Sequence, residues 1–446
     1  MKLKKYKLYE IADLNTSSIS NSDNTLSEII YLDTSSITEN VILSTYKVSI
    51  HEAPSRAQRR VKKNTILYST VRPRLKHYGI LSSPEANLIV STGFVTIDVK
   101  SEFQDSVDAR FLFLLLTQPH ITEYIASIAD SAVSAYPSFN PSDISALEFE
   151  FPEMNIQTHI ADIWEYYDSK IGLNRQINDN LEAMAKQLYD YWFVQFDFPN
   201  EEGKPYKSSG GAMVWNEKLK RDIPQGWSDC KLKDFINLFD SKRIPLSSKD
   251  RGERQGIYPY YGATGIMDYV NDYIFDGDYI LLAEDGSTSD GKGFPIVQYI
   301  WGKNWVNNHA HIILPKNEQY TMFTYQMLRS IPAKQIETGS IQKKISQENL
   351  CGHKMALPNS DLMEKYDKII FPLWEKRKRC IEEINTLIKQ RDELLPLLMN
   401  GQASVNYHLS VLFLSSLILY RDQYKLYDDE RNNYTSRFRR YESRSN

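Results

Sequence analysis

The sequence predicts an α+β fold in which two mixed α/β globular domains are joined by two long antiparallel coiled-coil helices with pseudo-two-fold symmetry. The first observation behind this fold class is a pair of long, charged, leucine-spaced segments, which include NDNLEAMAKQL from Asn178 and NTLIKQRDELL from Asn385. The second is that strand-like and helix-like segments precede each of them in the same order. Because 446 residues exceed what one hydrophobic core usually organises, two or more domains are expected.

An internal repeat organises the chain, and such a repeat takes priority over local patterns. When Pro152 is set against Pro358, the segment 131–152 aligns with the segment 337–358. This alignment pairs Ser134 with Ser340, Phe139 with Ile345, Asp143 with Asn349, Ile144 with Leu350 and, as the least similar pair, Leu147 with His353. Upstream, the strand-like stretches KNTILYS (63–69) and NLIVSTGFVTID (87–98) correspond to DGDYILLA (276–283) and WVNNHAHIIL (305–314). Order, spacing and residue type therefore recur in both halves.

Each half ends in a long helix with an apolar seam at spacings of three and four, as in a coiled coil. The first seam contains Ile160, Ile163, Tyr167, Ile171, Asn174, Asn178, Leu181, Ala185, Leu188 and Trp192, and the second contains Leu362, Tyr366, Ile369, Leu373, Lys376, Cys380, Leu387, Arg391, Leu394 and Leu398. Each helix is expected to span roughly 40 residues, or about 60 Å. The polar members Asn174, Asn178, Lys376 and Arg391 are candidates for fixing an antiparallel register.

The predicted boundaries follow from this repeat. They are a globular domain at 1–152, a spacer helix at 153–196, a polar, turn-rich linker at 197–226, a second globular domain at 227–358, a second spacer helix at 359–402 and a tail at 403–446. Antiparallel pairing of the helices would place the two globular domains at opposite ends. Two independent domains with unrelated exposed helices are the alternative at this point.

Composition is that of an ordinary globular protein, with 41% hydrophobic and 25% charged residues. A net charge of -4 argues against a protein that coats nucleic acid indiscriminately, although it does not exclude a local basic surface. The three cysteines form no CxxC pair and no secretory leader is recognised, so a reducing cytoplasm is expected. The longest apolar run, 409–419, is shorter than the roughly 20 residues that cross a bilayer, so no membrane is expected as a partner.

The strongest local charge signal is a basic run at 56–76 that contains no acidic residue. Its candidates for DNA contact are Arg56, Arg59, Arg60, Lys62, Arg72, Arg74 and Lys76, together with His77, which follows directly. Lysine and arginine suit phosphates, and arginine reads guanine edges through two hydrogen bonds. Pro73 is expected to stiffen the segment between Arg72 and Arg74. A solvated basic face without function is the alternative.

In the second half, Lys242 and Arg243 begin a weaker basic stretch that acidic residues dilute. Asn307, Asn308 and His309 are candidates for contacts to adenine or phosphate. In NNHAH (307–311), strand alternation puts His309 and His311 on one face, but two histidines without a third ligand do not predict a metal site.

Motifs for catalysis or nucleotide binding are not recognised. GSTSDGKG (286–293) has the spacing of a phosphate-binding loop but ends in Gly293 where a Ser or Thr should contact magnesium. FNPSD (139–143) lacks the second proline and the aromatic residue of the usual methyltransferase motif, and no nuclease carboxylate cluster is recognised. We therefore expect no catalytic residue, bound cofactor or metal in this chain.

Long blocks of the sequence resemble the specificity subunits of Type I restriction-modification enzymes. ADIWEYYDSKIGLNRQINDNLEAMAKQLYDYWFVQFDFPNEEGKPYKSSGG (161–211) is similar to the central conserved region of such subunits, and QRDELLPLLMNGQASV (390–405) is similar to their distal one. IYPYYGATGIMDYVNDYIFDGDYILLAEDG (257–286) resembles the second target-recognition domain, and YSTVRPRLKHYG (68–79) resembles a recurrent motif of these domains. The resemblance covers nearly all of residues 1–405.

The resemblance implies a non-catalytic reader of double-stranded DNA. In that family each target-recognition domain, here 1–152 and 227–358, reads one half of a bipartite asymmetric site. The helices act as a spacer ruler and dock two modification (methyltransferase) subunits, which restriction (translocase and nuclease) subunits join. S-adenosylmethionine, ATP and magnesium are used by those partners, and this chain binds none of them.

The resemblance also implies further contact residues. GSIQKKIS (339–346) is similar to a loop that lies close to DNA, which makes Gln342, Lys343 and Lys344 candidates, with Tyr136 in the corresponding loop of the first half. The resemblance fades after Val405, so the tail has no assigned function. The alternative from another class is a non-catalytic scaffold whose coiled coil assembles other proteins and whose globular domains bind a ligand other than DNA.

Overall fold

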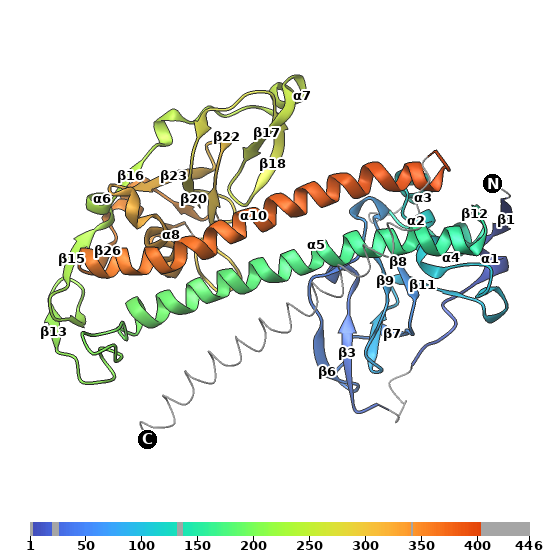
Figure 1. Cartoon of the computed structure of the whole chain (residues 1–446), viewed down its shortest axis with the longest axis horizontal. Coiled ribbons are helices and arrows are strands. Elements are labelled where there is room, and N and C mark those ends of the chain that lie inside the picture. The colour runs from blue at the N-terminus through green and yellow to red at the C-terminus, as the bar shows by residue number, and fades with distance from the viewer. Residues whose placement is uncertain (1–2, 20–25, 132–136, 340–341, 403–446) are drawn as a thin grey trace. The chain divides into compact units, whose positions relative to one another are not determined.

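Two long helices dominate the computed structural model, α5 (Met154–Tyr189) and α10 (Ser360–Met399) (Figure 1). The structure describes residues 3–19, 26–131, 137–339 and 342–402. The chain divides into two compact units: unit 1 holds the residues up to Asn174 and those from Glu383 onward, and unit 2 holds Arg175 to Glu382. Among the described residues, every helix is too short or too polar to cross a bilayer.

The described residues of unit 1 form two four-stranded sheets and two short strand pairs. The central sheet has the order β2 (Ala12–Leu14), β11 (Phe94–Val99), β8 (Thr65–Ser69) and β9 (Tyr78–Leu81), and all its neighbours are antiparallel. The outer sheet has the order β6 (Tyr46–Ser49), β3 (Glu28–Leu32), β10 (Leu88–Ser91) and β7 (Ala57–Arg60), with β3 and β10 parallel. One short pair joins β1 (Lys4–Lys7) to β12 (Glu148–Phe151), and the small β4 (Ile37–Thr38) and β5 (Val41–Ile42) form the other, a hairpin. Helices α1 (Leu8–Ile11), α2 (Ala109–Leu116), α3 (Pro119–Ser131) and α4 (Pro141–Ser145) complete the domain.

Unit 2 repeats the topology of the two four-stranded sheets and of the β1–β12 pair. Its central sheet has the order β16 (Ile236–Leu238), β23 (Ala310–Pro315), β20 (Tyr279–Ala283) and β21 (Val297–Ile300), all antiparallel. Its outer sheet has the order β18 (Ile266–Val270), β17 (Gln255–Tyr261), β22 (Lys303–Val306) and β19 (Phe275–Asp276), and its one parallel pair, β17 with β22, corresponds to β3 with β10. The pair β15 (Ser228–Lys231) and β26 (Lys354–Leu357) corresponds to β1 and β12. Helices α6 (Leu232–Phe235), α7 (Ser248–Glu253), α8 (Thr321–Ser330) and α9 (Gln347–Gly352) and the hairpin β24 (Glu337–Thr338) and β25 (Lys344–Ile345) complete it.

Matching backbone hydrogen bonds confirm the repeat that the sequence predicts. The Phe139 amide donates to the Thr70 carbonyl, 3.1 Å, as the Ile345 amide donates to the Glu284 carbonyl, 2.8 Å. The least similar predicted pair also holds, because the Leu147 carbonyl accepts from Leu8 as the His353 carbonyl accepts from Leu232, each at 2.9 Å. The two halves therefore share a backbone framework while their side chains differ.

The predicted linker, 197–226, contains a hairpin of its own, β13 (Met213–Asn216) with β14 (Arg221–Pro224). A single turn of π-helix, Asp190–Val194, ends α5 before this segment. Phe198 then stacks between Tyr206 and Trp227, with ring centroids 4.6 Å and 5.6 Å away.

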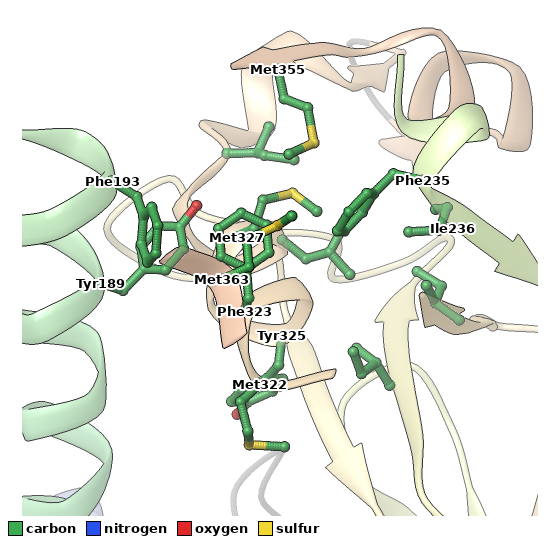
Figure 2. Close-up of a cluster of buried hydrophobic side chains, with 14 of the residues drawn as sticks. Tyr189, Phe193, Phe235, Ile236, Met322, Phe323, Tyr325, Met327, Met355 and Met363 are labelled. Carbon is green, nitrogen blue, oxygen red and sulfur yellow. The ribbon is translucent and has the colours of Figure 1, made fainter. Parts of the chain in front are cut away.

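The core of unit 2 is an aromatic and methionine cluster that α5 and α10 both enter (Figure 2). Tyr189 and Phe193 come from α5 and its π-turn, Phe323 from α8, and Met363 from α10, all nearly inaccessible to solvent. The Phe193 and Phe323 rings meet edge to face with centroids 4.9 Å apart. Full burial of such a side chain stabilises the fold by about 1.5–3 kcal/mol. The long helices are therefore structural parts of the domains and not only connections between them.

Within each unit, α5 and α10 pack antiparallel. In unit 1, Ile160 and Trp164 share a cluster with Leu395 and Leu398, and further along α5 Ile171 meets Ile384 and Leu387. In unit 2, the Tyr366 hydroxyl donates to the Ala185 carbonyl, 3.0 Å. Residue numbers thus fall on α10 as they rise on α5, as the apolar seams predict.

The seam prediction is wrong at one position of α10. Ile369 is 47% exposed, whereas Ile370 and Trp374 are each 1% exposed. The helix packs against α8 and the central sheet as well as α5. Its buried residues therefore do not follow a simple heptad pattern at this point. The predicted polar members Asn174 and Asn178 are buried, at 1% and 8% exposure.

Asp367 of α10 anchors the start of α8 in unit 2. Its carboxylate oxygens accept hydrogen bonds from the amides of Phe323, 2.9 Å, and Met322, 3.2 Å, which are among the first amides of that helix and have no partner within it. Burial raises the pKa of Asp367, the two backbone hydrogen bonds oppose this, and the resulting pKa is about 7. The folded state thus holds a proton that the unfolded chain releases near pH 4.

We expect this raised pKa to lower the stability of unit 2 as the pH rises from about 4 to about 7, where the carboxylate becomes charged. Asp367→Asn removes the charge but keeps only one of the two acceptor oxygens, so the variant should be less stable than the wild type at pH 5 and should lose this part of the pH dependence. Thermal unfolding midpoints at pH 5 and pH 8 measure both effects. Asp361→Asn, an exposed position on the same helix, is the control. An unchanged pH dependence in Asp367→Asn contradicts the assignment.

Candidate nucleic-acid interface

In unit 1, three loops meet at the end of the central strand β8. They are the turn 92–93 between β10 and β11, the segment 70–77 after β8 and the segment 137–140 before α4, and we name them loop cluster 1. The Thr70 amide donates to the Gly93 carbonyl, 2.9 Å, and the Thr70 carbonyl accepts from Phe139, 3.1 Å. Thr70 therefore ties all three loops together through its backbone.

Two arginines of the predicted basic run lie at this cluster. The Arg72 amide donates to the Pro137 carbonyl, and the Arg56 carbonyl accepts from the Thr92 amide, each at 2.8 Å. Both residues are exposed. Arg72 has a left-handed backbone, φ 49°, which is rare for a residue with a side chain and costs energy, especially before a proline. Such backbone strain is enriched at functional sites, although Glu39, Phe196 and Lys220 also have positive φ outside the loop clusters.

The basic residues at 59–63 lie outside the three loops of the cluster. Arg59 and Arg60 lie in β7, and Lys62 and Lys63 precede β8. The five residues of β8 separate these lysines from Arg72 by about 17 Å, because a strand rises about 3.3 Å per residue. The basic run in the sequence is thus not one basic patch on the surface.

Acidic residues from distant segments partly neutralise two members of the run. Arg74 is paired with Glu123, 3.1 Å, and with Asp130, 2.6 Å, both on α3, and Lys76 is paired with Glu39. The hydrogen bonds that Arg74 donates to Asp130 and Glu123 raise the pKa of Arg74. The sequence shows no acidic residue within the run, but the fold brings these three beside it.

Three further candidates have structural contacts or lie outside the described residues. His77 has Nδ1 at 2.7 Å from the Ile37 carbonyl, which only accepts, so this nitrogen carries the proton. Arg59 donates from Nη1 to the Asn15 carbonyl, 3.3 Å. Tyr136 lies outside the described residues, so its predicted role stays a prediction.

Unit 2 builds the equivalent loop cluster 2 with different side chains. It consists of the turn 307–309 between β22 and β23, the segment 284–288 after β20 and the segment 342–346 before α9. The Glu284 amide donates to the His309 carbonyl, 2.9 Å, as Thr70 does to Gly93. Asp285 faces Lys344 in a β-bridge, as Val71 faces Ser138. The predicted residues around 307–309 and 342–344 are therefore brought together.

Several polar side chains of loop cluster 2 are accessible. The side chains of His309, Lys343 and Lys344 are about half exposed, at 48%, 47% and 52%, and Gln342 and Asn308 are exposed as well. His309 has Nδ1 at 2.6 Å from an Asp285 carboxylate oxygen. A carboxylate only accepts, so Nδ1 carries a proton and Nε2 is the ring nitrogen that a ligand would meet.

Other candidates in unit 2 hold the loops and are not exposed for contact. Asn307 is 3% exposed, and its Oδ1 accepts from the His309 amide, 2.8 Å. Arg243, whose side chain is 13% exposed, donates from Nη1 to Glu284, 2.7 Å, and to the carbonyls of Asn308, 3.3 Å, and Ala310, 2.8 Å. The expectation that Arg243 and Asn307 are surface contacts therefore does not match their burial. Lys242 is exposed and lies over the Phe239 ring.

A group of charged side chains, all largely buried except Lys344, underlies loop cluster 2, and we name it the ion network. It consists of Asp240, Arg243, Glu284, His311 and Lys344. Asp240, Glu284 and His311 offer ligand atoms within 4.8 Å of one another, a spacing that a metal ion could use. However, His311 has Nδ1 at 2.6 Å from Asp240 and Nε2 at 2.7 Å from the Ile345 carbonyl. Since both nitrogens face acceptors, both carry protons and neither has a lone pair for a metal.

The pKa shifts in the ion network agree with this protonation. Burial lowers the pKa of His311, but hydrogen bonds to Asp240 and to the Ile345 carbonyl outweigh it and raise the pKa above its usual value. Burial opposes ionisation of Asp240, yet its hydrogen bond with His311 lowers its pKa. The pKa of Glu284 is likewise lowered, against its burial, chiefly by Arg243. Two carboxylates and three cations therefore coexist in charged form.

Sequence reasoning missed Asp240, Glu284 and Asp285. Asp240 was counted only as a residue that dilutes a basic stretch, although its spacing of three from Arg243 suits an ion pair in a turn. His311 gave a signal, because an inward-facing histidine in the apolar strand AHIIL requires polar partners. Those partners are distant in the sequence and are identified only in the fold.

Comparison with known proteins finds one family over most of the chain. The model of the Type I restriction modification DNA specificity domain matches residues 2–183 and 224–390. The chain is 32% identical to the Type I restriction enzyme HindI specificity subunit of Haemophilus influenzae, over 89% of this chain and 99% of that protein. It is 25% identical to the MjaIX specificity subunit of Methanocaldococcus jannaschii, over 77% of this chain and 78% of that protein.

A solved structure shares the fold. The crystal structure of a Type I restriction-modification system S subunit from M. genitalium matches with a TM-score of 0.53 and 17% sequence identity. The match covers 89% of this chain and 96% of that one. The family model matches the chain twice, once in each half, which agrees with the repeated topology. The solved structure agrees with it in fold. The chain therefore belongs to the family of Type I restriction-modification DNA specificity subunits.

Proposed function

We propose that this chain selects the DNA sequence for a Type I restriction-modification complex, with each loop cluster reading one half of a bipartite site. The observation that carries the proposal is that the two units present loops on the same backbone framework but with different polar side chains. Equivalent frameworks suit two similar duplex segments, and different side chains suit two different half-sites. The scaffold alternative is not favoured, because relatives over most of the chain are specificity subunits.

The two clusters differ in readout chemistry. Loop cluster 1 offers Arg56 and Arg72, whose guanidinium groups suit guanine edges or phosphates. Loop cluster 2 offers Gln342, the imidazole of His309, and Lys343 and Lys344, which suit adenine edges and phosphates. An asymmetric site follows from this difference.

The long helices suit a spacer that also docks partner proteins. At 1.5 Å per residue, the 36 residues of α5 span about 54 Å. We propose two modification subunits as partners on these helices, joined by restriction subunits, with S-adenosylmethionine, ATP and magnesium bound by those partners. Cys230, Cys351 and Cys380, all among the described residues, form no disulfide, which supports a reducing cytoplasm as the compartment.

Arg72→Ala should weaken binding of the assembled complex to its cognate DNA by about 1–3 kcal/mol, because Arg72 lies exposed at loop cluster 1. Arg74→Ala should cost less than about 0.5 kcal/mol, because Glu123 and Asp130 already take up its charge. Fluorescence anisotropy at several salt concentrations measures both, and the salt dependence should become shallower only in Arg72→Ala. Equal effects of the two substitutions would remove Arg72 from the interface.

Methyl transfer should require the partner subunits. With S-adenosylmethionine and cognate DNA, the purified chain should transfer no methyl group, whereas addition of modification subunits should produce transfer. Incorporation of radiolabelled methyl groups into DNA measures this. Activity of the chain alone, surviving further purification, would show that the assignment as a non-catalytic reader is wrong.

Lengthening both helices should lengthen the gap between the half-sites. Matched insertions of seven residues in α5 and α10, where unit 1 meets unit 2 in each helix, add about 10.5 Å, or roughly three base pairs at 3.4 Å each. Genome-wide mapping of methylated bases, in cells carrying the chain and its partner subunits, should find both half-sites unchanged and a longer gap. A change of half-site sequence with the gap fixed would refute the spacer role.

A further inference from the structure

Loop cluster 2 rests on the ion network, and each of its three loops is bound to it. Arg243 donates to the carbonyl of Asn308 in the turn 307–309. Glu284 begins the segment after β20 and pairs with Lys344 in the segment before α9, 3.1 Å. His311 binds the Ile345 carbonyl next to it, 2.7 Å. The network is therefore the shared support of the three loops that carry the candidate contacts.

The network holds together only if His311 is an imidazolium. Asp240 accepts from the Ile312 amide, 2.9 Å, and from Gln347, 2.6 Å, as well as from His311, so it acts as an ionised carboxylate. The ring of His311 is fully buried and donates from one nitrogen to Asp240 and from the other to Ile345. A neutral ring has one N–H and would leave one of these two acceptors without its donor.

Unit 1 builds the same framework without this network. Val95 takes the place of His311, since it pairs with Tyr68 of β8 as His311 pairs with Leu282 of β20. Thr70 takes the place of Glu284, as their shared hydrogen bonds show. Asn15 takes the place of Asp240, since its Oδ1 accepts from the Thr96 amide, 3.0 Å, as Asp240 accepts from the corresponding Ile312 amide, 2.9 Å. The framework thus forms without the charges, which points to a role particular to loop cluster 2.

We propose that the ion network centred on His311 is a positioning device for loop cluster 2, so that DNA readout by unit 2 depends on it and readout by unit 1 does not. This inference rests on the proposed function. His311, Asp240 and Arg243 act as positioning residues, because they are buried and set the places of Asn308, His309 and Lys344 without meeting DNA. The chain then has an internal control, since one half-site should change while the other stays the same.

Two variants test the proposal in the complex with modification subunits. His311→Gln keeps a polar side chain but supplies only one donor group for the two acceptors. The double variant Asp240→Asn with His311→Val supplies the residue types that unit 1 has at the equivalent contacts, Asn15 and Val95. It leaves no unpaired buried charge between the two positions, so it keeps the test valid if His311→Gln fails to fold. The matched control is Asp98→Asn, which alters a buried carboxylate of β11 that accepts from Thr65, 2.6 Å, away from loop cluster 1.

The measurement is discrimination between the cognate site and sites with single-base changes in either half. Both network variants should lose about tenfold or more of the discrimination in one half-site, the amount that one good base contact provides, and keep the other half within twofold. Asp98→Asn should not reproduce this one-sided loss. Equal loss in both halves, or discrimination unchanged in the double variant, overturns the proposal. If the wild-type complex selects no bipartite sequence, the proposed function itself fails, which is a distinct outcome.

A pH profile separates positioning from simple loss of packing. The charged groups facing His311 are Asp240, Glu284, Arg243 and Lys344, and Cys351 lies near Asp240. Because the pKa of His311 is raised above 6.5 in the folded protein, the imidazolium is fully present below that pH and is lost as the pH rises through the raised value. Wild-type discrimination at the affected half-site should therefore fall with rising pH, and the double variant should lose this dependence. A pH profile that is the same in both would contradict the role of the imidazolium.

Discussion

The packing of α10 against α5 is the constraint on which both units depend. Each compact unit contains a segment of both helices, and each hydrophobic core includes side chains from both. In unit 2 the Tyr366 hydroxyl binds the α5 backbone directly, while Trp374 fills the core behind it. Removing either helix would expose a core and not merely release a tether.

The two units share the same backbone hydrogen bonds between their loops but carry different side chains there. The loops that approach each other in unit 1 are tied through Thr70, and those in unit 2 through Glu284, by the same hydrogen bonds. Thr70 is uncharged, so the charge that loop cluster 1 offers comes from exposed arginines. Glutamate makes loop cluster 2 an ionic site, which must bury His311 and Arg243 as partners. Duplication of the framework therefore does not imply duplication of the recognition chemistry.

The basic run in the sequence and the accessible positive charge in the structure differ. The run at 56–76 has no acidic member, yet strand geometry divides it and Glu39, Glu123 and Asp130 partly neutralise it. Arg72 keeps its exposed place at the loops, whereas Arg243, equally basic in the sequence, is largely buried in ion pairs. Whether a basic side chain can contact a ligand depends on its exposure and on its ion-pair partners. Both are set by contacts between segments that are distant in the sequence. Sequence alone therefore ranks such residues poorly.

The sequence by itself determined the repeat, the two long helices, their antiparallel seams and the family, because periodic apolar spacing and ordered motifs are local properties of the chain. Even the weakly similar pair Leu147 and His353 takes the predicted place. Only the tertiary structure decided which face of α10 is buried, with Ile370 in place of Ile369, and which polar residues meet in the ion network. The physical reason is that Asp240, Glu284 and His311 are far apart in the chain and acquire their protonation states from one another only after the sheet has formed.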